Sequence, residues 1–112
     1  MSQTHVATSP DVDPNADLTL FQQNMLLVLA QHEDFRDYGL AIKRDLEELY
    51  GQDINHGRLY PNLDDLVEKG LIVKGELDRR TNYYELSLAG RELLEEDAQR
   101  RARIVNRFKD DL

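Results

Sequence analysis

The side chains best suited to chemistry lie together near the middle of the chain. Residues 54 to 72 read INHGRLYPNLDDLVEKGLI, and five hydrogen-bonding side chains are concentrated at the beginning: Asn55, His56, Arg58, Tyr60 and Asn62. Amide, imidazole and guanidinium groups can pair with the edges of nucleic-acid bases, and an arginine can bind both acceptors of a guanine. Such side chains on the first turns of a helix are typical of a helix that contacts bases in a major groove.

The apolar residues of this segment predict the helix that holds these side chains. They recur at intervals of three and four residues, as on the buried face of a helix: Leu59, Leu63, Leu66, Val67 and Leu71. Asn55 occupies the N-cap position, and Gly70 follows as a C-terminal glycine does. Pro61 lacks a backbone N–H group, so it is tolerated only near the start of the helix.

A second helix is predicted immediately before this one, across residues 38 to 50. Its expected buried positions are apolar residues at helical spacing: Leu40, Ile42, Leu46 and Leu49. Gly51 ends this helix, and Ile54 anchors the short turn that follows. Two helices joined by a short turn that contains glycine predict a helix-turn-helix.

Lys43 and Arg44 are the basic residues of the second helix. They can bind phosphate groups, because the first helix of a helix-turn-helix crosses the DNA backbone. They can equally pair with Glu47 and Glu48, which lie one helical turn further on. The sequence favours neither interpretation.

Two short strands are predicted at residues 71–77 and 82–87, because both segments are rich in β-forming residues. They form a hairpin whose base and tip carry hydrogen-bonding and basic side chains: Lys74, Arg79, Arg80 and Thr81. Arginine at such a tip can bind phosphate or enter a narrow minor groove. A solubilising turn is the alternative, and the adjoining helix favours the DNA role. We expect one of Tyr83 and Tyr84 to pack on the core.

Together these segments resemble the PadR-like family of winged-helix transcription regulators. The resemblance rests on GRLYPNLDDLVEKGLI, on Tyr38-Gly39, and on RTNYYEL followed by Ala89-Gly90, and it spans about residues 20 to 94. It implies a mainly α fold with a small β-hairpin, a winged helix-turn-helix with a long C-terminal dimerisation helix. It also implies a homodimer that binds double-stranded DNA. Arg58 replaces the small hydroxyl residue usual in the family, so the base preference does not transfer.

Two helices carry more apolar surface than one subunit needs. Residues 18 to 31 are apolar on nearly all sides, and the helix from 88 to about 110 has an apolar seam at close to 3.5-residue spacing. We therefore assign a subunit interface to both helices, with these residues: Leu18, Phe21, Met25, Leu94, Ala98, Val105, Phe108 and Leu112. Packing within one subunit accounts for part of the first helix.

The chain is predicted to have three parts. Residues 1–17 contain two prolines and three aspartates with almost nothing to bury, so we expect a disordered N-terminal arm. Residues 18–87 form the winged helix-turn-helix DNA-binding domain, and residues 88–112 form the C-terminal dimerisation helix. The arm has no lysine or arginine, which argues against a role in gripping DNA.

The composition is unusual for a protein that binds nucleic acid. The chain has 22 acidic and 14 basic residues, which gives a net charge of −8, whereas such proteins usually present a basic surface. Abundant Asp and Glu with few lysines is typical of a halophilic protein. At molar salt the screening length falls to about 3 Å, so long-range repulsion from DNA is largely removed. We expect cations such as K⁺ or Na⁺ to bridge acidic residues and DNA.

Other classes of function find little support in the sequence. The chain has no cysteine, no phosphate-binding glycine loop and no set of nucleophile and base, so we expect no enzyme, no catalytic residue and no cofactor. His32 beside Glu33 and Asp34 could suggest a metal, but no second His or Cys joins it at ligand spacing, so we predict a solvated helix end. A winged helix that binds proteins rather than DNA is the alternative function.

The location and the signal are expectations only. No apolar run is long enough to cross a membrane and no signal-peptide core is present, so we expect a cytoplasmic protein. The resemblance implies a response to small molecules or stress, including oxidative stress. Because cysteine is absent, direct oxidation would have to act on Met25 or on a ligand.

Overall fold

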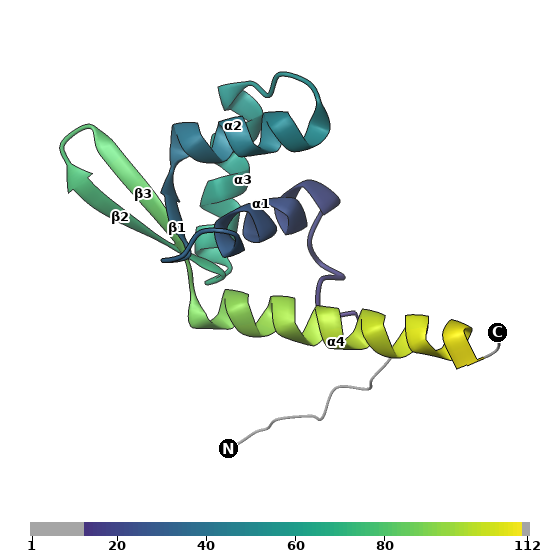
Figure 1. Ribbon diagram of the computed structural model, residues 1–112. Coiled ribbons are helices and arrows are strands. Elements are labelled where there is room, and N and C mark those ends of the chain that lie inside the picture. The colour runs from purple at the N-terminus through teal and green to yellow at the C-terminus, as the bar shows by residue number, and fades with distance from the viewer. Residues whose placement is uncertain (1–12, 111–112) are drawn as a thin grey trace, which may run out of the picture.

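The computed structural model describes residues 13–110, and it has four helices and one small sheet (Figure 1). In chain order the elements are α1 (Leu20–Ala30), β1 (Arg36–Tyr38), α2 (Gly39–Tyr50), α3 (His56–Glu68), β2 (Ile72–Asp78), β3 (Thr81–Leu86) and α4 (Leu88–Asp110). The hairpin of β2 and β3 projects to one side of α1, α2 and α3. Helix α4 runs along the opposite side from α2 and extends beyond the other helices. The predicted fold class, a winged helix-turn-helix with a long final helix, is confirmed.

The helix-turn-helix is fixed by one glycine and one glutamate. Gly51 caps α2 in the left-handed conformation, at φ 67°, which favours glycine, and its N–H donates to the Glu47 carbonyl at 2.8 Å. The Glu47 carboxylate accepts the N–H of Ile54 at 2.9 Å, and Ile54 is buried. Of the predicted buried positions, Ile42 and Leu46 are confirmed. The prediction was wrong for two others, which are 54% and 58% exposed: Leu40 and Leu49.

Helix α3 begins and ends where the sequence predicted. The Asn55 side chain caps it by accepting the N–H of Arg58 at 2.8 Å. At the other end Gly70 adopts φ 76°, and the N–H of Leu71 returns to the carbonyl of Leu66 at 3.0 Å. Pro61 lies in the second turn without ending the helix. Leu59, Leu63 and Leu66 are fully buried, so the opposite face of α3 is open to solvent.

The sheet has three antiparallel strands in the order β1-β3-β2, one more than predicted. Strand β1 escaped notice because it is only three residues long and reads Arg-Asp-Tyr, without an apolar pattern. It pairs Arg36 with Glu85 and continues directly into α2. Tyr84 is buried on the core side, while the Tyr83 ring lies against Gly75 on the other face. The expectation that one of these tyrosines packs inward is confirmed.

Helix α1 lies at the centre of the core, between the helix-turn-helix and α4 (Figure 1). Thr19 and Gln22 form a capping box at its start, each side chain accepting the other residue's backbone N–H. Most of the predicted arm, residues 1–12, lies outside the described residues. Residues 13–17 differ from the expectation of disorder, because they form turns and Asn15 is 1% exposed.

Helix α4 begins at Leu88, as predicted, after a Ser87 cap, and it leaves the core halfway along its length. The N–H of Gly90 donates to Ser87 Oγ at 3.0 Å. Leu93 and Leu94 pack on the core, whereas Val105 and Phe108 are 48% and 64% exposed. Within residues 13–110 no helix is long and apolar enough to span a membrane.

Candidate nucleic-acid interface

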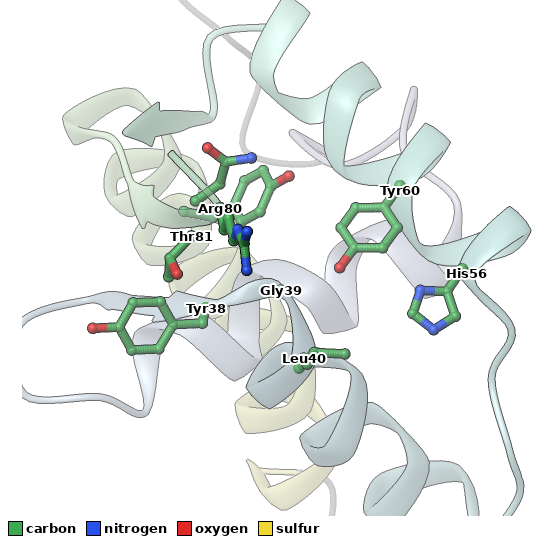
Figure 2. Close-up of a pocket in the computed structure, with 9 residues that line it drawn as sticks. Tyr38, Gly39, Leu40, His56, Tyr60, Arg80 and Thr81 are labelled. Carbon is green, nitrogen blue, oxygen red and sulfur yellow. The ribbon is translucent and has the colours of Figure 1, made fainter. Parts of the chain in front are cut away.

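The first turns of α2 and α3 and the tip of the β2–β3 hairpin surround one hollow of about 350 Å³. Figure 2 shows Tyr60 reaching from α3 toward Gly39 at the start of α2. His56 lies on one side of Tyr60, and Arg80 and Thr81 on the other. The structure therefore brings together residues from the predicted reading helix and the predicted wing, which are about twenty positions apart in the sequence.

Tyr60 fastens α3 to α2. A Cβ atom at position 39 would lie 2.8 Å from the Tyr60 hydroxyl, so a larger residue there would require the Tyr60 side chain to shift. The Tyr60 ring also stacks on the exposed His56 ring, with 5.6 Å between ring centroids. Tyr60 therefore sets the distance between the two helices, while His56 remains accessible at the mouth of the hollow.

Arg58 is exposed but is held on the flank of α3 that faces α1. Its guanidinium carbon lies 3.9 Å from the centroid of the Phe21 ring and 5.9 Å from that of Tyr50. Tyr50 is positioned in turn by a hydrogen bond from Asn24, at 2.8 Å. A cation over an aromatic ring at an exposed site gains about 0.5–1 kcal/mol, so the guanidinium can leave the ring at small cost.

The two asparagines serve the helix more directly than sequence reasoning suggested. The Asn55 side chain caps α3, as described above. The Asn62 amide donates to the Arg58 carbonyl at 2.7 Å, and its oxygen accepts from Gln22 at 3.2 Å. Gln22 also donates to Asp65 at 2.7 Å, so one buried side chain of α1 aligns the middle of α3. No pattern in the sequence distinguishes Gln22, because it stands beside Gln23 and Asn24 and has no spacing signal of its own.

The most outward line of α3 is acidic rather than basic. Opposite the buried leucines lie four exposed residues at helical spacing: Gly57, Pro61, Asp64 and Glu68. Asp65 stands beside this line and binds Lys69 at 2.6 Å. The hydrogen bonds from Lys69 and then Gln22 hold the pKa of Asp65 below its usual value, so it is ionised at neutral pH.

The hairpin tip is ordered by one aspartate. Asp78 Oδ1 accepts the backbone N–H groups of Arg80 and Thr81 at 2.8 and 3.0 Å. These bonds, with that of Arg80 first, lower the pKa of Asp78. Both tip arginines are exposed, as is Lys74 on β2. The turn is therefore fixed by its backbone while the guanidinium groups of Arg79 and Arg80 extend into solvent.

The two basic residues of α2 differ from each other. Lys43 binds the Glu47 carboxylate at 2.9 Å, which matches the ion-pair interpretation. Arg44 is exposed on the next position of the helix. The Ile54 N–H, followed by Lys43, lowers the pKa of Glu47, because both stabilise its charged form.

The predicted subunit interface needs correction at α1. Leu18, Phe21 and Met25 are only 9%, 6% and 0% exposed, so they belong to the core of one subunit. Leu20 and Leu27 are instead 66% and 48% exposed. Neither leucine is among the predicted interface residues, although their seven-residue spacing places them on one face.

Beside α4 these exposed leucines line a groove of about 360 Å³. The α4 side of this groove includes Leu94, which is half-buried, and Ala98, which is exposed. Val105 and Phe108 continue the exposed apolar surface along α4. Leu112, the last residue of the predicted seam, lies outside the described residues.

Comparison with known proteins places this arrangement in a family. The model of the PadR-like family of transcriptional regulators matches residues 25–96. RosR from H. salinarum, in a structure obtained from NaBr, is 49% identical in sequence to this chain and has a TM-score of 0.71. The match covers 87% of this chain and 96% of that chain. A complex structure of the same protein is 47% identical with a TM-score of 0.72, over 92% and 96%.

A more distant solved structure has the same fold, and a further regulator matches in sequence. Sco3205, a MarR family transcriptional regulator from Streptomyces coelicolor in complex with DNA, has a TM-score of 0.69 at 19% identity, over 88% of this chain and 60% of that chain. The transcriptional activator GvpE of Haloferax mediterranei is 29% identical over 83 residues. Those residues are 74% of this chain and 41% of GvpE. With the family model covering well over half of its length, the chain belongs to the PadR-like family of transcriptional regulators.

Proposed function

We propose that this regulator binds DNA sequence-specifically, as a homodimer on an inverted-repeat site at high salt. The observation that carries the proposal is that three elements meet around one hollow. The starts of α2 and α3 and the Arg80 tip of the wing surround one hollow, so they can contact one duplex together. In this proposal residues 18–87 contact DNA, and residues 88–112 pair the subunits.

The roles of the side chains follow from their exposure and contacts. Arg58 leaves its place on Phe21 and binds a guanine, while His56 contacts a neighbouring base or phosphate. Arg79 and Arg80 hold the backbone beside the wing, with Arg44 as a further phosphate contact. Asn55, Tyr60 and Asn62 chiefly set the position of α3.

A second copy of the chain is the partner that fits α4. The first half of α4, residues 88–97, has four acids and one base, and the second half, 98–110, has five bases and one acid. Two α4 helices that pair antiparallel therefore bring opposite charges together along their length. The same pairing covers Val105 and Phe108, which one subunit leaves exposed.

The groove between α1 and α4 supports the same partner. The Asn15 amide and Asp97 Oδ1 are buried there without a hydrogen-bond partner among residues 13–110. An unpaired buried polar group costs about 1–3 kcal/mol, so a polar side chain from a second subunit would be stabilising at this position. Two reading helices related by a dimer axis would enter successive major grooves about 34 Å apart.

Cations complete the proposed complex. Asp64 and Glu68 lie on the outward line of α3, where a duplex would approach, and the ionised Asp78 lies at the wing. Cations held between these carboxylates and phosphate groups would cancel their repulsion. Binding then persists or strengthens near molar potassium, whereas ordinary DNA-binding proteins lose affinity steeply as salt rises.

We extend the proposal to a stress response with an indirect signal. The chain has no cysteine, and Met25 is fully buried in the core. Oxidants therefore reach the regulator through another molecule rather than by modifying Met25. An unchanged Met25 in protein recovered from oxidant-treated cells, measured by mass spectrometry, is the expected result.

Selection of bound genomic fragments at molar potassium chloride tests the main proposal. The fragments recovered by the wild-type protein should share an imperfect inverted repeat with half-sites about one helical turn apart. Fragments without a common repeat would contradict the proposal. Stable capture of a protein partner without any DNA shift at high salt would instead favour a protein-binding winged helix.

A further inference from the structure

Three metal-ligating side chains meet on the side of the molecule formed by the α1–β1 connection. His32 Nε2 lies 2.9 Å from Asp37 Oδ2 and 3.2 Å from Asp45 Oδ2. All three atoms lie within 4.8 Å of one another. His32 follows α1, Asp37 belongs to β1 and Asp45 belongs to α2, so the group joins three separate elements. None of its members lines the hollow assigned to DNA.

The separations suit the ligands of a single metal ion. Zinc binds imidazole nitrogen and carboxylate oxygen at about 2.0–2.2 Å, so neighbouring ligand atoms in tetrahedral or octahedral geometry stand about 3.0–3.4 Å apart. The two distances from His32 Nε2 fall close to that range. The two carboxylate oxygens lie within 4.8 Å of each other, so an ion would bind once they rotate to face one common point.

The charges also call for a cation at this position. Two carboxylates face one ring nitrogen, and that nitrogen has at most one proton to donate. The second carboxylate then has no N–H of the ring left to accept, and the negative charge of the first carboxylate repels it. The other oxygen of Asp37 accepts the Tyr38 N–H at 2.8 Å, which aims Oδ2 at His32. The side chains of His32, Asp37 and Asp45 are 34%, 17% and 33% exposed, so solvent screens the group only in part.

We propose that His32, Asp37 and Asp45 bind a divalent first-row transition metal ion such as Mn²⁺ or Zn²⁺. One imidazole with two carboxylates suits these ions, whereas Mg²⁺ and alkali ions prefer oxygen ligands alone. Bound metal would tie the end of α1 to β1 and α2, and β1 leads directly into the helix-turn-helix (Figure 1). The site therefore links metal binding to the element that positions α3.

No metal site was predicted at His32, because only Glu33 and Asp34 lie beside it in the sequence. The residues that meet His32 are five and thirteen positions away and come together only through the fold. Neither Glu33 nor Asp34 is part of the group. This makes Glu33 a suitable control, since its carboxylate is exposed and adjacent in sequence.

Calorimetric titration of the full chain with Mn²⁺, Zn²⁺ and Mg²⁺ in molar potassium chloride tests the proposal. Wild-type protein should bind one Mn²⁺ or Zn²⁺ ion per chain and should bind Mg²⁺ much more weakly. His32→Gln and Asp45→Asn should each weaken binding by about tenfold or more, because each removes a ligand. Glu33→Gln should bind as the wild type does. Absence of Mn²⁺ and Zn²⁺ binding, or equal binding by His32→Gln, would overturn the proposal.

A second measurement needs no substitution. Mn²⁺ is paramagnetic and broadens the NMR signals of nearby protons. Substoichiometric Mn²⁺ should therefore broaden the ring signals of His32 before those of the exposed His56 on α3. Broadening of His56 first, or of both rings equally, would place the ion elsewhere and contradict the assigned site. This result is independent of DNA binding, so it separates failure of the metal site from failure of the proposed function.

Discussion

At the scale of single residues, side chains with similar chemistry have different tasks. Arg58 and Arg80 are both exposed arginines, yet Arg58 rests on an aromatic ring of α1 and Arg80 extends from a hairpin tip. An arginine at the start of a reading helix can reach base edges, whereas one on a wing meets mainly the backbone. Removing either arginine should therefore impair DNA binding in a different way.

Arg58→Ala should relax sequence specificity, while Arg80→Ala should weaken binding to all sequences alike. Loss of a bidentate guanine contact costs about 1–3 kcal/mol against the preferred base only. Loss of a phosphate contact lowers affinity uniformly and reduces the salt slope. Competition binding between selected and unrelated duplexes distinguishes the two. Equal and uniform losses from both variants would contradict the assigned roles.

Glu47 should contribute stability that depends on pH. Its pKa is lowered in the folded protein by the Ile54 N–H and by Lys43, from an ordinary value of 4.5. A carboxyl group with a depressed folded pKa stabilises the protein fully above its unfolded pKa, and the contribution is lost as pH falls through the lower folded value. Glu47→Gln should therefore lower the free energy of unfolding relative to wild type at pH 7. The difference between the two proteins should shrink below about pH 4.5.

Urea unfolding of Glu47→Gln and wild type at neutral and acidic pH measures this effect. Glu48→Gln is the matched control, because Glu48 is an exposed neighbour on the same helix. An equal loss of stability at both pH values for Glu47→Gln would show that the carboxylate charge is not the cause.

At the scale of elements, structure that depends on one segment could be predicted from the sequence. Contacts between segments could not. Three features of the first kind depend only on residues of α3 and its two ends: the cap at Asn55, the buried leucines and the left-handed Gly70. The burial of Phe21 and Met25 could not be assigned this way, because a helix that is apolar all round gives no sign of which face meets the core. Strand β1 forms only because β3 is there to pair with it.

The candidate site shows the same limit. The helix at residues 56–68 and the hairpin were predicted, but the sequence could not show that Asn62 is bound by Gln22, forty positions earlier. Nor could it show that Arg58 lies over Phe21. Such contacts depend on the packing of α1 against α3, and no spacing rule within either helix encodes them.

The junction between the sheet and α4 depends on one glycine. A Cβ atom at position 90 would lie 2.3 Å from the backbone carbonyl oxygen of Leu71, which cannot move aside as a side chain can. Gly90→Ala should therefore destabilise the protein by about 1–3 kcal/mol, as overpacking does. Ala89→Ser, at the exposed neighbour, should change stability by less than about 0.5 kcal/mol. Thermal unfolding measures both, and equal stability of Gly90→Ala and wild type would contradict the contact.

At the scale of the whole molecule, two subunits explain features that one subunit leaves open. Helix α4 extends beyond the core with exposed apolar residues, and its charge reverses along its length. The exposed Leu20 and Leu27 of α1 border the same region. The proposed dimer would cover these surfaces and present two copies of α3 to the duplex.

Phe108→Asp should therefore shift the protein toward monomers and reduce its affinity for an inverted repeat. A charge placed in an apolar interface is costly, because it loses water without gaining a partner. Leu77→Asp is the control for the mass measurement alone, since Leu77 is 63% exposed but lies on the wing rather than on α4. Light scattering after size-exclusion chromatography gives the mass. A dimeric Phe108→Asp, or an equal effect of Leu77→Asp, would contradict the assigned interface.

Binding to a selected inverted repeat and to its isolated half-site, titrated with potassium chloride, tests the central claim most directly. The claim is that a net-negative protein selects DNA through two copies of α3 with the help of cations. We predict that affinity for the full repeat persists or rises toward molar salt, and that the half-site binds much more weakly at every concentration. A steep fall in affinity with salt, or equal affinity for the half-site, would contradict the account.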